Sequence, residues 1–542
     1  MENIKKVILE AVPEAVIEET TPLSVTVEPD KLRTLVKALR NYAEFPFDYL
    51  AMMTGMDWGG EKLGVIYLLA SSKDLSVEVA VKTGTADREN PLLYTVTDIY
   101  ETAHYNEREA YAMLGIRFIN NPDMRRFFLN ADWVGFPLRK DYDANPVLNA
   151  VSKESRDIID IAPPRIMEDA NGNLKEENVD IFEKDDYIIN IGPQHPSTHG
   201  VMHFRVALDG EIVKKIDVHS GYIHRGIEKL SEKLTYPQIL HFTDRLDYLS
   251  ANINRHGLCM CVEKAAQIEI PERAQYIRTI MDELNRIDSH LVAWGGTMCM
   301  DLGSTTAFIY GMREREDILK IFEKNTGGRL IINYNVIGGV MFDIQPDFQS
   351  DVKTFIPVMR KALDEYNRLF TGNVIAVGRM KNLGLLTRED AISYAVTGPA
   401  GRASGFSCDI RKHAPYALYD KVEFKEIIRT NNDAFDRYLN RLDEIEESLK
   451  IIEQLIDNIP EGDFLAKTKA IIKLPEGEYY QRVEAGRGEF GVYINSKGDK
   501  TPYRLKFRSP SMAAVSVMPL ICKNEKISDF IGIGGIYGLC DS

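Results

Sequence analysis

Hydrophobic positions in the first 145 residues follow the spacing of strands in some segments and of helices in others. Residues 62–72 (KLGVIYLLASS) and 75–84 (LSVEVAVKTG) are rich in β-branched side chains and are separated by a short polar turn, which predicts paired strands. Residues 31–44 and 97–114 carry apolar side chains at helical spacing. The pattern therefore predicts an α+β domain of modest size over residues 1–145.

The next segment, residues 146–186, is mostly polar. It contains the pairs Pro163-Pro164 and Asn171-Gly172, which are typical of turns and loops. This composition predicts a linker with little regular structure, at which two originally separate proteins could be joined.

Residues 187–542 form the third block, which begins with strand patterns. Residues 187–192 (YIINIG) and 202–221 (MHFRVALDGEIVKKIDVHSG) alternate in the manner of strands, with a turn expected at Asp209-Gly210. The rest of the block has mainly helical spacing, so we expect a mainly helical domain with a small β-sheet.

Two long helices are predicted in this block. Residues 271–296 begin with Pro271 in a first helical turn and are expected to end at Gly295-Gly296. Residues 433–457 form an amphipathic helix for core packing, with charges expected on the opposite face. Its apolar stripe consists of Phe435, Leu439, Leu442, Ile445, Leu449, Ile452 and Ile456.

Composition narrows the class of protein. The chain has 542 residues with 44% hydrophobic side chains, which argues against global disorder, and its net charge of -15 argues against a free-standing nucleic-acid binder. No apolar run reaches the roughly 18 residues of a membrane span, and the first residues lack the apolar core of a signal peptide. Six cysteines are few for this length. We expect a soluble cytoplasmic chain that can dock on a membrane protein.

The stretch GPQHPSTHG, residues 192–200, raises the question of a metal site. His195 and His199 are four residues apart, but Pro196 fits only a first helical turn and no glutamate follows His195 as in a zinc hydrolase. A turn with structural histidines is the default interpretation of this stretch alone.

For two other candidate motifs, a structural role is a better interpretation than a metal-binding or nucleotide-binding role. Cys259 and Cys261 form C-x-C without a second pair, which favours buried apolar thiols over a four-thiolate site. Residues 532–538 (GIGGIYG) resemble a dinucleotide loop, but Tyr537 occupies the third glycine position and no room remains for a following helix and strand.

Residues 241–250 (HFTDRLDYLS) concentrate polar groups in a short span. Asp244, Arg245 and Asp247 would ordinarily make an ion-paired helix face. However, a tyrosine such as Tyr248 and a histidine brought together can also hydrogen-bond a quinone carbonyl and transfer protons.

Four separated blocks carry a resemblance that is more specific than any single motif. They are NIGPQHPSTHGVMHFRVALDGEIV, GYIHRGIEKL, TYPQILHFTDRLDYLS and PERAQYIRTIMDELNRIDSHL, and in this order they closely resemble the D subunit of respiratory complex I, the proton-translocating NADH–quinone oxidoreductase. The runs HYNEREAYAMLGIRFINNPDMRRFF and GFPLRKDY resemble its C subunit. The chain is thus similar to a fused C/D subunit, with a D domain that resembles the large subunit of nickel–iron hydrogenases.

The resemblance implies a set of quinone-site residues. It places His199 at the head of the quinone cavity as a partner of the headgroup, with His195 in the same loop, and Tyr248 as the opposing hydrogen-bond donor. Asp301, in MDLGS, matches the acidic residue that orients the histidine, and a carboxylate beside an imidazole fixes its tautomer and raises its pKa.

The resemblance also implies the partners. Arg225 and Arg245 match arginines near the terminal [4Fe-4S] cluster of the neighbouring B subunit, where positive charge favours the reduced cluster. Electrons would pass from that cluster to a quinone bound between the B and D subunits, and two electrons and two protons give quinol. The chain itself would hold no metal or cluster, no NADH and no flavin. It would also contact the I subunit and the membrane H subunit, on the cytoplasmic face of the inner membrane.

Two alternatives remain open at this point. A membrane-bound nickel–iron hydrogenase large subunit needs two C-x-x-C pairs, which the spacing of Cys259 and Cys261 does not provide. A scaffold with an inactive quinone site is the other alternative, and the presence of His199, Tyr248 and Asp301 argues against it.

Several positions depart from the family pattern. Ile331 stands where many members carry a histidine beside the terminal cluster, and Val336 replaces an arginine common in the Y-x-R-I-G-G block. Val218 stands where a proline is frequent, and the ending GLCDS lacks the usual terminal arginine. We therefore expect a divergent branch of the family, in which the midpoint potential of the cluster depends only weakly on pH.

Overall fold

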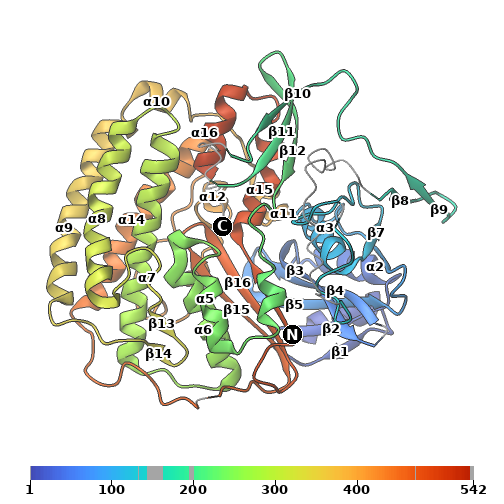
Figure 1. Ribbon diagram of the computed structural model, residues 1–542, viewed down its shortest axis with the longest axis horizontal. Helices are drawn as coiled ribbons and strands as arrows, with labels where there is room; N and C mark the ends of the chain where they lie inside the picture. Colours follow the sequence, from blue (N-terminus) through green and yellow to red (C-terminus); the bar gives the residue numbers. More distant parts are fainter. Residues whose placement is uncertain are drawn as a thin grey trace.

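A computed structural model describes residues 2–60, 62–131, 133–142, 163–194, 200–469 and 471–537 (Figure 1). The first domain contains a five-stranded sheet in the order β1-β2-β5-β4-β3, in which β3, β4 and β5 are antiparallel neighbours and β2 and β5 are parallel. Its elements are α1 (Glu2–Ala11), β1 (Val16–Glu18), β2 (Leu23–Thr26), α2 (Leu32–Arg40), β3 (Tyr49–Gly59), β4 (Lys62–Ser71), β5 (Asp74–Thr85), β6 (Leu92–Tyr94), α3 (Ala103–Leu114) and β7 (Arg117–Ile119). The predicted strand pair is confirmed as β4 and β5. The predicted helix over 97–114 is shorter, because α3 begins only at Ala103.

The segment expected to be a linker contains regular structure. β8 (Arg165–Glu168) and β9 (Leu174–Glu177) form an antiparallel hairpin, so the expectation of little regular structure is wrong there. Gly172 has a φ of 81° in the connecting turn, and the backbone N–H of Asn120 donates to Ile166 O at 2.7 Å. The hairpin is therefore attached to the first domain by a backbone bond that the polar composition did not predict. Residues 143–162 lie outside the described residues.

The second block begins with a three-stranded sheet and continues with helices. The sheet order is β10-β11-β12, with β10 (Tyr187–Ile191), β11 (His203–Asp209) and β12 (Ile212–His219). This confirms both predicted strand segments and the predicted turn at Asp209-Gly210, which joins β11 to β12. Long helices α7, α8, α9 and α14 then stand side by side (Figure 1). The helical elements up to the middle of the block are α4 (Ile227–Ser231), α5 (Tyr236–Thr243), the 3-10 turn η3 (Tyr248–Ser250), α6 (Ala251–Ala266), α7 (Glu272–Val292), the π-helix η4 (Ala293–Cys299), α8 (Thr305–Thr326), α9 (Phe348–Tyr366) and η5 (Asn367–Thr371).

The remaining elements complete the block. They are β13 (Asn335–Val336), β14 (Gly339–Val340), α10 (Val374–Gly378), α11 (Arg388–Ser393), α12 (Gly398–Arg402), α13 (Ile410–His413), α14 (Ala434–Ile456), β15 (Gly477–Ala485), β16 (Gly488–Ser496), β17 (Arg504–Arg508), α15 (Pro510–Ile521) and α16 (Ile527–Tyr537). The chain thus has the expected α+β fold, a sheet domain followed by a mainly helical one.

One predicted helix ends later than expected, and the other has a buried polar face. The helix after Pro271 does not end at Gly295-Gly296, because α7 continues without a break into η4. α14 matches the predicted range, but the face opposite its apolar stripe is not in solvent. Arg437, Glu444 and Ser448 on that face are all buried.

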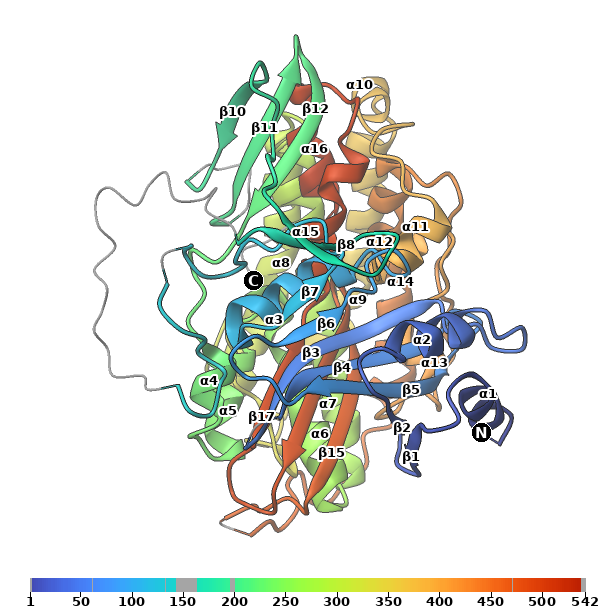
Figure 2. The ribbon, with the colours of Figure 1, turned by 90° about the vertical axis from the view of Figure 1, so that its right-hand side faces the viewer.

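One hydrophobic core joins the two domains. Met52 and Leu68 of the first sheet belong to the same cluster as Tyr480 and Val492 of the β15-β16-β17 sheet. β3–β5 and β15–β17 lie next to each other in both views (Figures 1 and 2). The two sheets therefore pack as one body.

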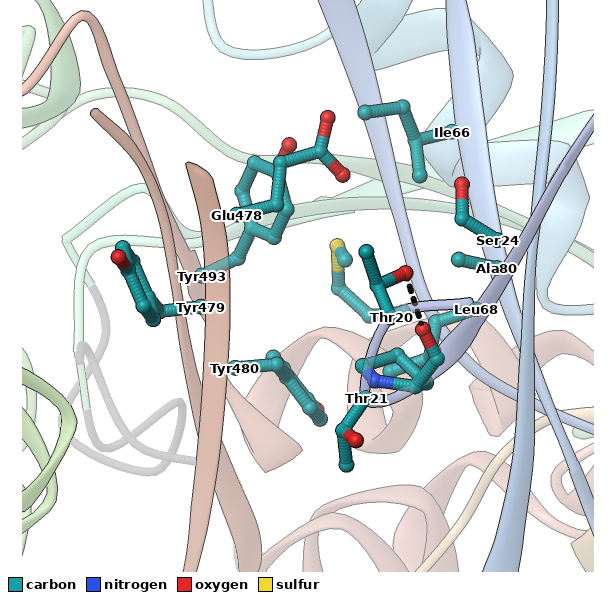
Figure 3. A pocket seen from close by; sticks show the side chains of 12 residues that line it. Thr20, Thr21, Ser24, Ile66, Leu68, Ala80, Glu478, Tyr479, Tyr480 and Tyr493 are labelled. Carbon is teal, nitrogen blue, oxygen red and sulfur yellow. Dashed lines mark hydrogen bonds between the residues drawn. The ribbon is translucent and has the colours of Figure 1, made fainter. Parts of the chain in front are cut away.

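A small apolar pocket, partly open to solvent, lies at this seam. Figure 3 shows Ile66, Leu68 and Ala80 of the first domain facing Tyr480 and Tyr493 across it. Its lining includes none of the residues that the sequence predicts for the quinone site.

Candidate functional site

The loop that carries the two candidate histidines connects strands β10 and β11. Ile191 pairs with Phe204 at the base of this hairpin, where a Cβ on Gly192 would clash with Met202 O. Gly192 has a φ of 89°, so this close approach requires glycine. His195 and His199 themselves lie outside the described residues.

Helix α16 supports the base of this loop. The ring of Phe204 on β11 meets that of Phe530 on α16 edge to face, with centroids 5.2 Å apart. Ile191 and Met202, on the two sides of the base, belong to the same buried cluster as Phe530 and Ile533. The sequence 532–537, considered above as a dinucleotide loop, is therefore part of a supporting helix.

Asp301 lies against the same helix. It follows η4, and a Cβ on Gly535 of α16 would come within 2.6 Å of its Oδ2 atom. Thr297 Oγ1 donates to Gly535 O at 3.2 Å, which fixes η4 against α16. α16 thus brings the base of the histidine loop and Asp301 into one neighbourhood, although they are about 100 residues apart in sequence.

Tyr248 opens the η3 turn and is half-buried. The carboxylate of Asp247 caps this turn by accepting the N–H of Leu249 at 3.1 Å. Asn285 of α7 donates its side-chain N–H to Leu249 O at 3.2 Å. Tyr248 therefore projects from a short turn that is bonded to the long helix leading to Asp301.

The two candidate arginines are exposed. Arg225 lies in the loop between β12 and α4, next to His224, whose ring stacks on Phe128 of the first domain at 5.2 Å. Arg245 follows α5 and donates to His241 O at 2.8 Å. Both are thus available to a neighbouring protein.

The ion pairs expected within residues 241–250 are instead made with distant elements. Asp244 is buried and accepts from Arg255 Nη1 at 2.9 Å, and burial raises the pKa of Asp244 to about 6. Asp247 binds Arg487 in the turn between β15 and β16. The short span is therefore no solvent-facing helix surface.

The thiols of Cys259 and Cys261 are buried as predicted. Cys259 and Cys261 lie on α6 without exposure to solvent, and burial raises the pKa of both thiols to about 12. The described parts of the chain contain no group of three or more His, Cys, Asp or Glu side chains arranged to hold a metal ion.

Sequence reasoning missed a buried ionic network between α7, α12, α13, α14 and β15. Arg402 binds Glu444 at 2.8 Å and Glu484 at 2.7 Å, while Arg411 binds Glu283 at 3.1 Å. Burial raises the pKa of Glu484 to about 7, against the influence of Arg402. The charged face of α14 was the available signal, but its spacing is also that of an ordinary solvated face.

Comparisons with known proteins agree with this architecture. Residues 25–147 match the family described as respiratory-chain NADH dehydrogenase, 30 Kd subunit. Residues 301–473 and 467–541 match the 49 Kd subunit of the same enzyme. The chain is 58% identical over 488 residues to the NADH-quinone oxidoreductase C/D subunit of Phocaeicola vulgatus, covering 90% of this chain and 93% of that protein.

The chain belongs to the family of fused C/D subunits of NADH-quinone oxidoreductase. A second relative of that name, from Bacteroides thetaiotaomicron, is 53% identical over 522 residues, covering 94% of this chain and 96% of the relative. The NADH-quinone oxidoreductase D subunit of Bacillus mycoides is 46% identical over 358 residues, covering 66% of this chain and 98% of that protein. The predicted fusion of C-like and D-like parts is confirmed.

Membership of this family gives the class of enzyme to which the chain belongs. The chain is a subunit of an oxidoreductase complex, the respiratory NADH dehydrogenase, and therefore works with other subunits. In the described parts of the chain, no helix combines the length and the apolar character needed to span a membrane.

Proposed function

We propose that this chain forms the quinone-reduction site of the complex together with the B subunit, which would hold the terminal [4Fe-4S] cluster. One observation carries the proposal. The base of the histidine loop and Asp301 lie against the same helix, α16, through the Phe204–Phe530 contact and through Gly535. This arrangement supports a histidine–carboxylate pair at one wall of a cavity.

The proposed chemistry uses two proton donors. Tyr248 would donate a hydrogen bond to one quinone carbonyl, and His199, oriented by Asp301, to the other. A carboxylate beside the imidazole favours its protonated form, so the pair can supply a proton as negative charge develops on the quinone oxygen. Two electrons from the cluster and these two protons convert the quinone to quinol.

The exposed arginines support the proposed partner. Arg225 and Arg245 would face the B subunit, where their positive charge stabilises the reduced cluster. The chain would also contact the I subunit and the membrane H subunit as a peripheral component on the cytoplasmic face of the inner membrane. The upstream electron donor would be NADH or a ferredoxin-like protein.

Co-purification is the first test of the assembly. A tagged chain is purified from its own membranes in mild detergent, and the associated proteins are identified by mass spectrometry. A four-cysteine iron–sulfur subunit and polytopic membrane subunits are expected. Recovery of the chain alone, or with nickel, would refute the assembly and favour a free-standing protein or a hydrogenase.

Tyr248→Phe then tests the site, because it removes only the hydroxyl. Quinone reduction should fall by about 10²-fold, while reduction of an artificial acceptor that takes electrons upstream of the quinone stays unchanged. Tyr276→Phe is the matched control, since Tyr276 is also half-buried but lies in the first turns of α7. Equal activities of the two variants would contradict the proposed role of Tyr248.

A further inference from the structure

The turn between β15 and β16 contacts the segment that carries Tyr248. Arg487, in this turn, directs Nη1 at both carboxylate oxygens of Asp247, at 2.6 and 2.5 Å. Both side chains are largely buried, with exposed fractions of 9% and 8%. A buried charge-assisted contact of this kind fixes geometry more strongly than a surface ion pair does.

The same turn also holds the other end of η3. The backbone N–H of Gly486 donates to Ser250 Oγ at 3.2 Å. A Cβ on Gly486 would come within 2.6 Å of Ser289 Oγ on α7, so the turn is confined between η3 and α7. Tyr248 therefore lies between two residues, Asp247 and Ser250, that are both bonded to the β15–β16 turn.

The turn is itself held from the opposite side. Thr397, at the start of α12, accepts the N–H of Glu489 at 3.0 Å. A Cβ on Gly488 would come within 2.5 Å of Thr397 Oγ1, and a Cβ on Gly398 would clash with Arg487 O. Because these close neighbours confine the turn, the backbone of Arg487 is held in a fixed position.

We propose that Arg487 is a positioning residue for the hydroxyl of Tyr248 in quinone reduction. It holds the carboxylate of Asp247 in place, and that carboxylate orders the η3 turn by capping the N–H of Leu249. This inference rests on the proposed function of Tyr248. It adds that the orientation of the Tyr248 hydroxyl is set by a residue from a distant part of the chain.

The expected effect follows from the geometry. Loss of the guanidinium leaves the cap of η3 in place but releases the carboxylate from its fixed neighbour. A displacement of about 1 Å at a reacting group can lower a rate by about 10²-fold, and the remaining bonds of Ser250 and Leu249 limit the movement. We expect Arg487→Gln to lower kcat for quinone reduction by about tenfold, with a smaller change in KM.

The test uses the intact complex with five variants, namely Tyr248→Phe, Arg487→Gln, Arg487→Lys, the double variant Tyr248→Phe/Arg487→Gln and a control. Arg487→Gln should reduce quinone turnover, and Arg487→Lys, which keeps the charge, should recover most of it. In the Tyr248→Phe background, Arg487→Gln should add less than about a twofold change, because an effect exerted through the hydroxyl is already lost. Arg273→Gln is the matched control. Its ion pair with Asp343 is 2.9 Å long and lies at the opposite end of α7 from Ser289.

Each outcome distinguishes the inference from the proposed function. If Tyr248→Phe lowers quinone turnover but Arg487→Gln does not, the positioning role is wrong and the proposed site stands. If Arg487→Gln lowers turnover equally in both backgrounds, Arg487 acts independently of the tyrosine and the inference is wrong. If Tyr248→Phe has no effect, the proposed function of Tyr248 and the inference fail together. Should Arg487→Gln not assemble, Asp247→Asn applies the same test from the other partner.

Discussion

Asp217 offers a direct test of how the histidine-loop sheet is held to the first domain. It lies on β12 and is 5% exposed. Its Oδ1 accepts from Arg125 Nη2 of the first domain at 2.6 Å, and its Oδ2 accepts from Arg205 Nη2 of β11 at 2.6 Å. His219 Nε2 lies 2.6 Å from the same Oδ2. One carboxylate thus connects the first domain with the sheet whose loop carries His195 and His199.

Asp217→Asn should destabilise this connection strongly. Removal of one partner from a buried ion pair typically lowers the free energy of unfolding by about 3–5 kcal/mol, because the other charge stays buried. Asp123 still binds Arg125 at 2.7 Å, so we expect the lower end of this range, about 3 kcal/mol. Urea unfolding of the full chain, followed by tryptophan fluorescence, measures the change.

A surface pair provides the control. Glu453 also binds an arginine through both oxygens, at 2.6 and 2.7 Å, but its side chain is 42% exposed. Glu453→Gln should therefore change the free energy of unfolding by less than about 1 kcal/mol. Equal shifts of the urea midpoint in the two variants would refute the reasoning that burial makes the Asp217 cluster important.

The loss of unfolding free energy caused by Asp217→Asn should also depend on pH. Burial by itself raises the pKa of Asp217, but the hydrogen bonds from His219 and Arg125 outweigh it and hold the pKa below its usual range. A carboxyl group whose pKa is lower in the folded than in the unfolded state stabilises the fold at pH values above its unfolded-state pKa, about 3.9. This stabilisation is lost progressively as the pH falls below that value. The difference between wild type and variant should be full at pH 7 and shrink below about pH 4. A constant difference across this range would contradict the electrostatic explanation.

Three further predictions concern the proposed site and the thiols. Gly535→Ala places a Cβ 2.6 Å from Asp301 Oδ2 and should therefore displace this carboxylate. Quinone turnover should fall about tenfold while upstream electron transfer is unchanged. Turnover at the wild-type rate would contradict the placement of Asp301. Cys259 and Cys261, whose pKa burial raises to about 12, should resist iodoacetamide at pH 8 in the folded chain and react in urea, as mass spectrometry would show. Ile331 cannot take up a proton, so redox titrations at several pH values should give a shallow slope for the partner's cluster, and a steep slope would refute this.

The sequence predicted the helices and strands better than it predicted the tertiary contacts that their side chains make. The apolar stripe of α14 was correct because helical spacing is a local property. The predicted charges do lie on its opposite face, but the sequence did not indicate that Arg437 and Glu444 are buried there. Their partners come from distant segments; Glu444, for example, binds Arg402 across 42 residues. A charge pattern within one helix cannot reveal such partners.

The same limit applies to the proposed site. Tyr248 and Asp301 could be named from the family resemblance, but Arg487 could not, because it is 240 residues from its partner Asp247. The sequence also did not indicate that the helix continues from α7 past Gly295. Glycine normally favours a helix end, yet here a Cβ on Gly295 would come within 3.3 Å of the α8 backbone at Phe308. The glycine serves helix packing, which only the tertiary structure shows.

Buried arginines of β17 bond the C-like part of the chain to the D-like part. Arg508 of β17 is buried and donates to Ala51 O of the first sheet at 3.2 Å and to Ala395 O of the D-like part at 2.8 Å. Arg504 donates to Thr54 Oγ1 at 2.9 Å. Buried guanidinium groups with such fixed acceptors tolerate little sliding of one sheet over the other. Because the β15–β16 turn next to Tyr248 belongs to that same second sheet, the first domain stiffens the support of the proposed quinone site.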